Sequence, residues 1–98
     1  MSEGTYAGAC RIELKERGIP YESEKSFAVH YHGEFLGRHT VDLLIDRRLV
    51  LELKCVEQIH PVHLVQTTRY MRLARVRLGL LVNFNVPVLK QGIRRIVL

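Results

Sequence analysis

Asp42, Glu52 and Lys54 are the residues of this sequence whose types and spacing best suit chemistry. Side chains alternate between the two faces of a strand, so Glu52 and Lys54 point the same way. If Asp42 lies opposite Glu52 on a neighbouring strand, the two Cβ atoms are only ~5 Å apart. Two carboxylates that close repel each other, and partial burial makes the repulsion more costly. Positive charge has to compensate, and Lys54 supplies only one unit of it.

A divalent cation would supply the remaining positive charge. Mg²⁺ and Mn²⁺ are hard ions that prefer carboxylate oxygens. In phosphodiester hydrolysis such an ion polarises the phosphoryl oxygen, lowers the pKa of an attacking water and stabilises the leaving oxygen. A nearby lysine orients that water or stabilises the pentacovalent charge. The three residues therefore indicate metal-dependent phosphodiester cleavage, and the alternative is a solvated strand face with an ordinary surface ion pair.

The loop between two strand-like segments decides whether the carboxylates meet. A charged turn separates two segments rich in strand-forming residues, which indicates a hairpin. The segments are residues 41–45 and 49–55, and the turn is 46–48. If Ile45 pairs with Leu49, then Asp42 faces Glu52 directly. A loop with an even number of residues would put the two carboxylates on opposite faces of the sheet.

The other elements follow from periodicity and from helix start and stop signals. Gly18 and Pro20 end a first helical segment, and Pro61 suits the first turn of a second. Alternation of apolar residues marks the strands. The predicted elements are a helix at 3–17, strands at 27–32, 41–45 and 49–55, a helix at 61–75, and strands at 76–84 and 93–98. The order α-β-β-β-α-β-β predicts an α/β fold, with residues 1–98 as a single domain.

Composition and charge indicate where the protein is located and what kind of partner it binds. Fifteen Lys and Arg residues against ten Asp and Glu give a net charge of +5, which favours an anionic partner, most commonly nucleic acid. No apolar run approaches the ~20 residues of a membrane helix, and no secretory signal is evident, so we expect a cytoplasmic protein without membrane contact. Two isolated cysteines make neither a disulfide framework nor a paired-cysteine zinc site. A core this small is compatible with a homodimer.

Residues flanking the acidic site extend the pattern to nearly the whole chain. Gln66 and Tyr70 lie four apart on the second helix and share a face, and Glu3 and Tyr6 are neighbours on the first. The succession resembles the PD-(D/E)XK nuclease superfamily, and within it the small prokaryotic group called GxxExxY proteins. The matching fragments are Glu3-x-x-Tyr6, Glu13-Leu14-x-x-Arg17-Gly18-Ile19-Pro20, Asp42-Leu43-Leu44, Glu52-Leu53-Lys54, Pro61-Val62-His63, Gln66-x-x-x-Tyr70 and Arg77-Leu78-Gly79-Leu80-Leu81-Val82-Asn83-Phe84.

The resemblance implies a restriction-endonuclease-like core, in which helices flank a mixed central β-sheet. It implies Mg²⁺ or Mn²⁺ as the cofactor and assigns a role to each matching side chain. Asp42 and Glu52 would be metal ligands, Glu3 would complete the metal environment, Lys54 would be the catalytic lysine, and Gln66 and Tyr70 would line the site near the DNA backbone. The leading glycine of the family's motif would precede Met1, so we expect the motif to be truncated at this end.

Basic side chains near the second helix are candidates for contacts with nucleic acid. Arg69 and Arg72 suit a phosphate-contacting ridge, with Arg38 and His63 as further contacts. A solvated helix face is the alternative for the arginines. His60 and His63 have a spacing that zinc ligands use, but no further Cys or His completes a set, so surface or capping roles are favoured.

The leading hypothesis is metal-dependent hydrolysis of nucleic acid, with DNA favoured over RNA. One rival is a catalytically inactive module of the same fold that binds nucleic acid through its basic surface. Another is a protein-interaction domain within a larger complex. Cleavage that depends on a divalent metal would distinguish the nuclease from both rivals. Salt-sensitive binding of nucleic acid without turnover would identify the inactive binding module.

Overall fold

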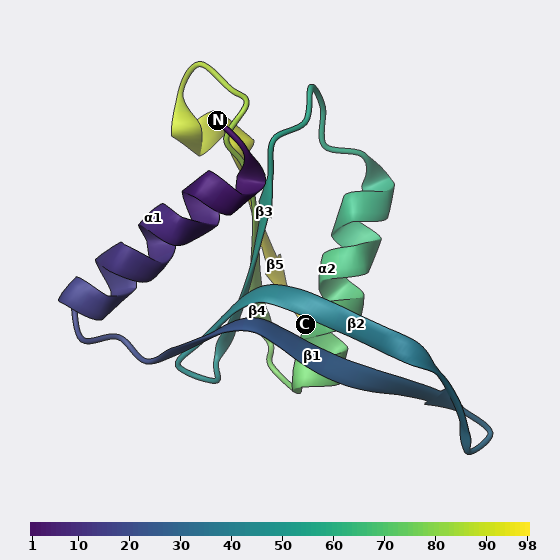
Figure 1. Cartoon of the computed structure of the whole chain (residues 1–98). Helices are drawn as coiled ribbons and strands as arrows, with labels where there is room; N and C mark the ends of the chain where they lie inside the picture. The colour runs from purple at the N-terminus through teal and green to yellow at the C-terminus, as the bar shows by residue number, and fades with distance from the viewer.

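The computed structural model describes all 98 residues, and its elements follow the predicted order (Figure 1). Two helices, five strands and one short 3₁₀ helix make up the fold. They are α1 (Glu3–Glu16), β1 (Tyr21–Tyr31), β2 (Glu34–Ile45), β3 (Leu49–Lys54), α2 (Pro61–Ala74), β4 (Leu78–Asn83), η1 (Leu89–Gly92) and β5 (Ile93–Val97). The predicted α/β class is therefore confirmed. The first strand begins at Tyr21, earlier than predicted.

The five strands form one mixed sheet in the order β1-β2-β3-β4-β5. Every neighbouring pair is antiparallel except β3 and β4, which run parallel. A parallel pair needs a crossover connection, and α2 provides it. In Figure 1 the sheet separates the two helices, with α1 on one face and α2 on the other. This is the layered arrangement that the predicted fold requires.

Each face of the sheet has its own hydrophobic cluster. On the α2 side the buried members are Val41, Leu44, Val50, Tyr70, Met71 and Val76. On the α1 side they are Leu43, Leu51, Leu53 and Val82, with Ala7, Cys10 and Leu14 of α1 packed against them. No residue of α1 is itself buried, whereas α2 buries Thr67, Tyr70 and Met71. The α2 side is therefore the more closely packed one.

Local signals set the ends of the two helices, and Gly18 and Pro61 act as the sequence predicts. The Ser2 hydroxyl accepts a hydrogen bond from the backbone N–H of Thr5 and caps α1. Gly18, just past the end of α1, has φ +67, a value that costs glycine little. Pro61 occupies the first turn of α2, where its missing N–H is not needed. Neither helix is long and apolar enough to cross a membrane.

The β2–β3 hairpin has the predicted register. Ile45 pairs with Leu49, Leu44 with Val50 and Leu43 with Leu51. Asp46 and Arg47 both have positive φ, near +52 and +53, as the central residues of a type I′ turn do. The Arg48 N–H closes this turn on the Ile45 carbonyl at 2.9 Å, and Arg48 then remains as an extra residue before Leu49 pairs with Ile45. The next positions beyond Leu43 and Leu51 are Asp42 and Glu52.

The β1–β2 hairpin is much longer than its neighbours. Its pairs run from Tyr21↔Ile45 to Tyr31↔Glu34, whereas β2 pairs with β3 only over Leu43–Ile45. The outer part of the hairpin therefore has no third strand beside it. It extends away from the rest of the molecule in Figure 1. We call residues 25–41 the arm.

Candidate active site

Asp42 and Glu52 lie where β2 and β3 separate, immediately beyond the last paired residues of the hairpin. The backbone N–H of Asp42 donates to Glu52 Oε1 at 3.0 Å. In return, the backbone N–H of Leu53 donates to Asp42 Oδ2 at 2.8 Å. Each carboxylate thus binds the strand that carries the other. In a longer ladder between β2 and β3, backbone carbonyl groups would accept the hydrogen bonds from these two N–H groups. Here the two acid side chains accept them instead.

The backbone around Asp42 is irregular on both sides. Val41 and Leu44 are three residues apart, yet both belong to the cluster on the α2 side, so simple alternation fails between them. On β1, Glu24 lies opposite Asp42, between the pairs Ser23↔Leu43 and Lys25↔Val41, and has φ +52. This irregularity accompanies the turn of Asp42 toward β3, where its carboxylate reaches the Leu53 N–H.

Glu52 is buried, and its carboxyl group holds its proton unusually tightly. Its side chain is only 4% exposed. Burial is the main cause that raises the pKa of Glu52 from 4.5 to about 8, and the neighbouring charge of Asp42 raises it further, against an opposing effect of Lys54. The alternative of a solvated strand face is therefore wrong for Glu52. Without an additional positive charge, this carboxyl is mostly protonated at neutral pH.

The side-chain oxygens of Asp42 and Glu52 supply part of the coordination that a hard divalent cation needs. One oxygen of each carboxylate accepts a backbone hydrogen bond. A side-chain hydrogen bond with Asp42 also raises the pKa of Glu52, and it is lost when both groups are ionised. The oxygens freed in that state match the preference of Mg²⁺ and Mn²⁺. No group of three or more His, Cys, Asp or Glu side chains is close enough to hold a metal ion. Water or a phosphate oxygen would have to supply the other ligands.

Lys54 ends β3 on the same face as Glu52. Its side chain is half-buried and forms none of the ion pairs in the structure. Its charge lowers the pKa of Glu52 and also that of His63, so it lies near both groups. The Lys54 carbonyl accepts a hydrogen bond from the backbone N–H of Phe84 at 2.9 Å, which ties the end of β3 to the end of β4. The ammonium group is left free to meet an anion.

Gln66 and Tyr70 share one face of α2, as predicted. Gln66 Nε2 donates to the Tyr70 hydroxyl at 3.0 Å. Burial raises the pKa of Tyr70, and the charges of Glu52 and Asp42 add to the rise, which places the phenol beside the acids. His39 of β2 packs edge-on against the Tyr70 ring, with the centroids 5.9 Å apart. Sequence reasoning missed His39, whose only signal is its position shortly before Asp42 on the same strand.

His63 lies at the start of α2, near Lys54. Its Nδ1 accepts a hydrogen bond from the backbone N–H of His60 at 3.0 Å, so the predicted capping role is confirmed. This bond leaves the proton of a neutral imidazole on Nε2. Burial lowers the pKa of His63, and Lys54 and His60 lower it further, whereas Glu3 raises it. The neutral ring is therefore a hydrogen-bond donor at the mouth of the site.

Glu3 is exposed in the first turn of α1 and does not converge with Asp42 and Glu52. Its influence on His63 shows that it faces the same region of the molecule. The Tyr6 ring stacks on Phe84 at 4.0 Å with an interplanar angle of 5°, which fixes the start of α1 beside β4. Phe84 in turn bonds to Lys54, so one chain of contacts links α1 to the site. Glu3 as a metal ligand stays a prediction.

A cavity of about 360 Å³ opens beside Lys54. The lining residues are Lys54, Val62, His63, Val65, Gln66 and Arg69. It combines positive charge with neutral hydrogen-bond donors, which suits a phosphate. Arg69 also lines an adjoining groove that contains Arg72. Arg38 does not line this cavity; it lies on the arm, where its Nε donates to Ser26 Oγ at 2.7 Å.

Asn83 and Asn85 support the loop that follows β3. Asn83 is buried, its Oδ1 accepts from the Val56 N–H at 3.1 Å, and its Nδ2 donates to the Val56 carbonyl at 2.8 Å. The Asn85 N–H also donates to Asn83 Oδ1. These amides therefore satisfy the backbone groups at a strand end.

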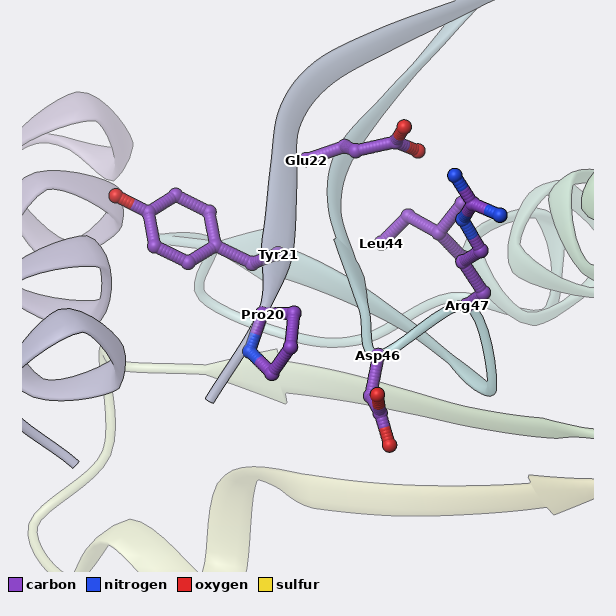
Figure 2. Close-up of a pocket in the computed structure, with 6 residues that line it drawn as sticks. All are labelled: Pro20, Tyr21, Glu22, Leu44, Asp46 and Arg47. Atoms are coloured by element: carbon purple, nitrogen blue, oxygen red, sulfur yellow. The ribbon is translucent and has the colours of Figure 1, made fainter. Parts of the chain in front are cut away.

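A second hollow lies between the start of β1 and the β2–β3 turn, with a volume of about 380 Å³ (Figure 2). Its lining residues are Pro20, Tyr21, Glu22, Leu44, Asp46 and Arg47. Figure 2 shows that the carboxylates of Glu22 and Asp46 point in different directions. The hollow contains none of the predicted functional residues and gathers no set of metal-binding side chains.

A comparison with protein families agrees with this geometry. The model of the PD-(D/E)XK nuclease superfamily matches residues 1–96. The match spans both helices and every strand except the last residue of β5. No curated protein and no solved structure matches the chain.

Proposed function

The chain belongs to the PD-(D/E)XK nuclease superfamily, and on that premise we propose that it is a divalent-metal-dependent nuclease that cleaves phosphodiester bonds in DNA. The observation that carries the proposal is the pairing of Asp42 with buried Glu52 at the point where β2 and β3 part. A buried carboxylate beside a half-buried one bears an electrostatic cost, and a bound cation can compensate for it.

Asp42 and Glu52 would hold Mg²⁺ or Mn²⁺ through their free oxygens, with Glu3 as a further ligand. When bound, the ion would polarise the phosphoryl oxygen and lower the pKa of the attacking water. The backbone N–H groups of Leu53 and Asp42 fix the orientation of the two carboxylates. The two metal-binding side chains are therefore in position before a metal ion binds.

Lys54 would act on the reacting phosphate. Its ammonium forms no ion pair within the protein and borders the cavity beside α2, so it is available to stabilise the negative charge that develops in the transition state. Gln66 lies on the cavity wall, where its side chain suits a phosphate oxygen, and its Nε2 also donates to the Tyr70 hydroxyl. We assign catalytic or positioning roles to these residues on that basis.

Phosphates that flank the reacting bond would meet the basic face of α2. His63, Arg69 and Arg72 lie along the cavity and its adjoining groove, and Arg38 adds a charge on the arm. Contacts with phosphates are independent of sequence and sensitive to salt. The proposal includes a cytoplasmic location, a single domain over residues 1–98 and assignment to the GxxExxY group on the spacing of Glu3 and Tyr6.

Cleavage of labelled DNA in Mg²⁺ and in Mn²⁺ tests the proposal, with single-stranded DNA, duplex DNA and RNA as parallel substrates. Asp42→Asn, Glu52→Gln and Lys54→Met are each expected to lower the rate by about 100-fold or more, because each removes a charge from the centre of the site. Asp46→Asn, in the exposed β2–β3 turn, is the matched control and should cleave like the wild type. Cleavage that survives in the three site variants would identify a contaminating nuclease.

A binding module without turnover is the second candidate. The separation of Glu3 from the other two acids favours it, since no three acidic or histidine ligands are assembled. It predicts that wild-type protein binds DNA with strong salt dependence but cleaves no substrate in either metal. Isothermal titration with Mn²⁺ then separates the two candidates: heat of binding that Asp42→Asn abolishes supports the nuclease.

A further inference from the structure

The arm carries large exposed side chains far from the core. Tyr31 is 66% exposed, Phe35 58% and Leu36 65%. Phe35 pairs with His30, and their rings meet edge to face at 5.7 Å. Side chains of directly paired residues share a face, so Tyr31, the next residue after His30, points to the opposite face. The tip therefore presents one aromatic ring on each side of a two-stranded ribbon.

A register shift shapes the tip. Val29 pairs with Gly37 and His30 with Phe35, which leaves Leu36 as an extra residue in β2. Such a bulge strengthens the local twist and disrupts the regular edge, which disfavours pairing with another strand. An extended sheet formed with a second copy of the chain is thus a poor match to this tip.

The charges of the arm suit a polyanion. Between Glu24 and Asp42 the sequence contains one carboxylate, Glu34, against the cations Lys25 and Arg38. Lys25 also pairs with Glu22 at 3.8 Å, so Arg38 is the cation of the arm that no acid pairs. Ser26 Oγ accepts a hydrogen bond from Arg38 Nε at 2.7 Å, which holds the guanidinium along the strand. A polyanion lying on β2 would meet no acid from Phe35 to Val41.

The arm is continuous with the candidate active site. Phe35 precedes Asp42 by seven residues on the same strand. At ~3.3 Å per residue the separation is about 23 Å, which corresponds to about seven stacked nucleotides of one strand. His39 lies between the two, against Tyr70. A strand whose phosphodiester lay at Asp42 would reach the tip of the arm.

We propose that the arm binds the single-stranded segment that flanks the cleaved bond, with Tyr31 and Phe35 stacking on unpaired bases. The inference rests on the proposed function for the location of the cleaved bond, but its binding step does not require cleavage. In a duplex the faces of the bases are covered by their neighbours, so exposed protein rings select unpaired bases. Aromatic stacking of this kind tolerates any base sequence. The preferred substrate is therefore DNA with a single-stranded flank or overhang.

Fluorescence anisotropy in EDTA tests the proposal without turnover. A labelled duplex of about 15 base pairs is compared with the same duplex carrying an overhang of about 8 nucleotides, longer than the span from Asp42 to the tip. The wild type should bind the overhang duplex about tenfold more tightly. Tyr31→Ala combined with Phe35→Ala should abolish that preference. Leu36→Ala is the matched control, since it removes an equally exposed aliphatic side chain from the same tip, and should keep the preference.

A fluorescence signal reports the stacking directly. The sequence has no tryptophan, so Phe35→Trp introduces a single one whose emission the overhang should quench and the blunt duplex should not. Circular dichroism verifies the fold of each variant. Equal affinity for both duplexes, or an effect of Leu36→Ala as large as that of the aromatic variant, would overturn the proposal. So would a dimer in sedimentation that only the aromatic variant converts to monomer, because a second copy would then cover the tip.

The two proposals can fail separately. If the wild type cleaves nothing yet prefers the overhang duplex through Tyr31 and Phe35, the proposal for the arm is supported and the nuclease proposal is refuted. If cleavage depends on Asp42 but is equal on blunt and overhanging DNA, the nuclease proposal stands and the arm falls.

Discussion

Replacement of Glu52 by glutamine should stabilise the metal-free protein while it removes the candidate chemistry. Glutamine has the same shape, and its amide oxygen can accept the Asp42 N–H bond that Glu52 Oε1 accepts at 3.0 Å. It carries no ionisable proton. Burial, reinforced by Asp42, raises the pKa of Glu52 from 4.5 to about 8 in the folded protein. The substitution therefore isolates the cost of ionising this carboxyl.

The size and sign of the effect follow from linkage. Between pH 4.5 and about 8 the folded protein keeps a proton on Glu52 that the unfolded chain has released. The contribution of this proton to the free energy of unfolding is fully present below pH 4.5. It falls by about 1.4 kcal/mol for each pH unit above that value, until the pH passes about 8. By pH ~7 the loss is about 3 kcal/mol. The glutamine variant lacks this loss, so its melting temperature should exceed that of the wild type by roughly 15 °C near neutrality.

Thermal and urea unfolding in EDTA, followed by circular dichroism from about pH 5 to about pH 8, measure the effect. The advantage of Glu52→Gln over the wild type should grow steadily with pH. Glu57→Gln, at an exposed position of the loop after β3, should show no such growth. Mn²⁺ should raise the stability of the wild type more than that of Glu52→Gln. A stability difference that is flat across this pH range would refute the assignment of a buried, ionisable acid.

Two glycines should respond to alanine with opposite signs. Gly92→Ala would drive its Cβ against the Asn83 carbonyl oxygen, which is backbone and cannot move aside cheaply, so we expect a loss of about 3 kcal/mol or more in urea unfolding. Gly8→Ala places its Cβ at an ordinary 3.5 Å from Arg11 Nη2 inside α1, so it should raise stability by about 1 kcal/mol in the same assay. A destabilising Gly8→Ala would show that close packing at α1 excludes even one methyl group.

Much of the fold is predictable because its signals are local. Gly18 ends α1, Pro61 begins α2, and apolar alternation marks the strands, so the order of elements needs no distant contact. The charged segment Asp46–Arg48 is visible in the sequence, and its three residues are the odd number that the pairing of Ile45 with Leu49 requires. Counting residues in this register places Asp42 and Glu52 at the positions just beyond the last pair, Leu43 and Leu51. Strand boundaries were less accurate: β1 begins at Tyr21, where neighbouring β2 supplies hydrogen bonds that no local pattern announces.

The sequence by itself determined which residue types are available and which strand positions face one another. Only the tertiary structure decided how the acids are held, because the reciprocal bonds of Asp42 and Glu52 require β2 and β3 to part where the ladder ends. It also decided the burial that raises the pKa of Glu52, since α2 has to pack over that face. The contact of His39 with Tyr70 and the distance of Glu3 from the acids depend on helix placement. Helix placement is set by side-chain packing between segments far apart in the chain, which periodicity cannot specify.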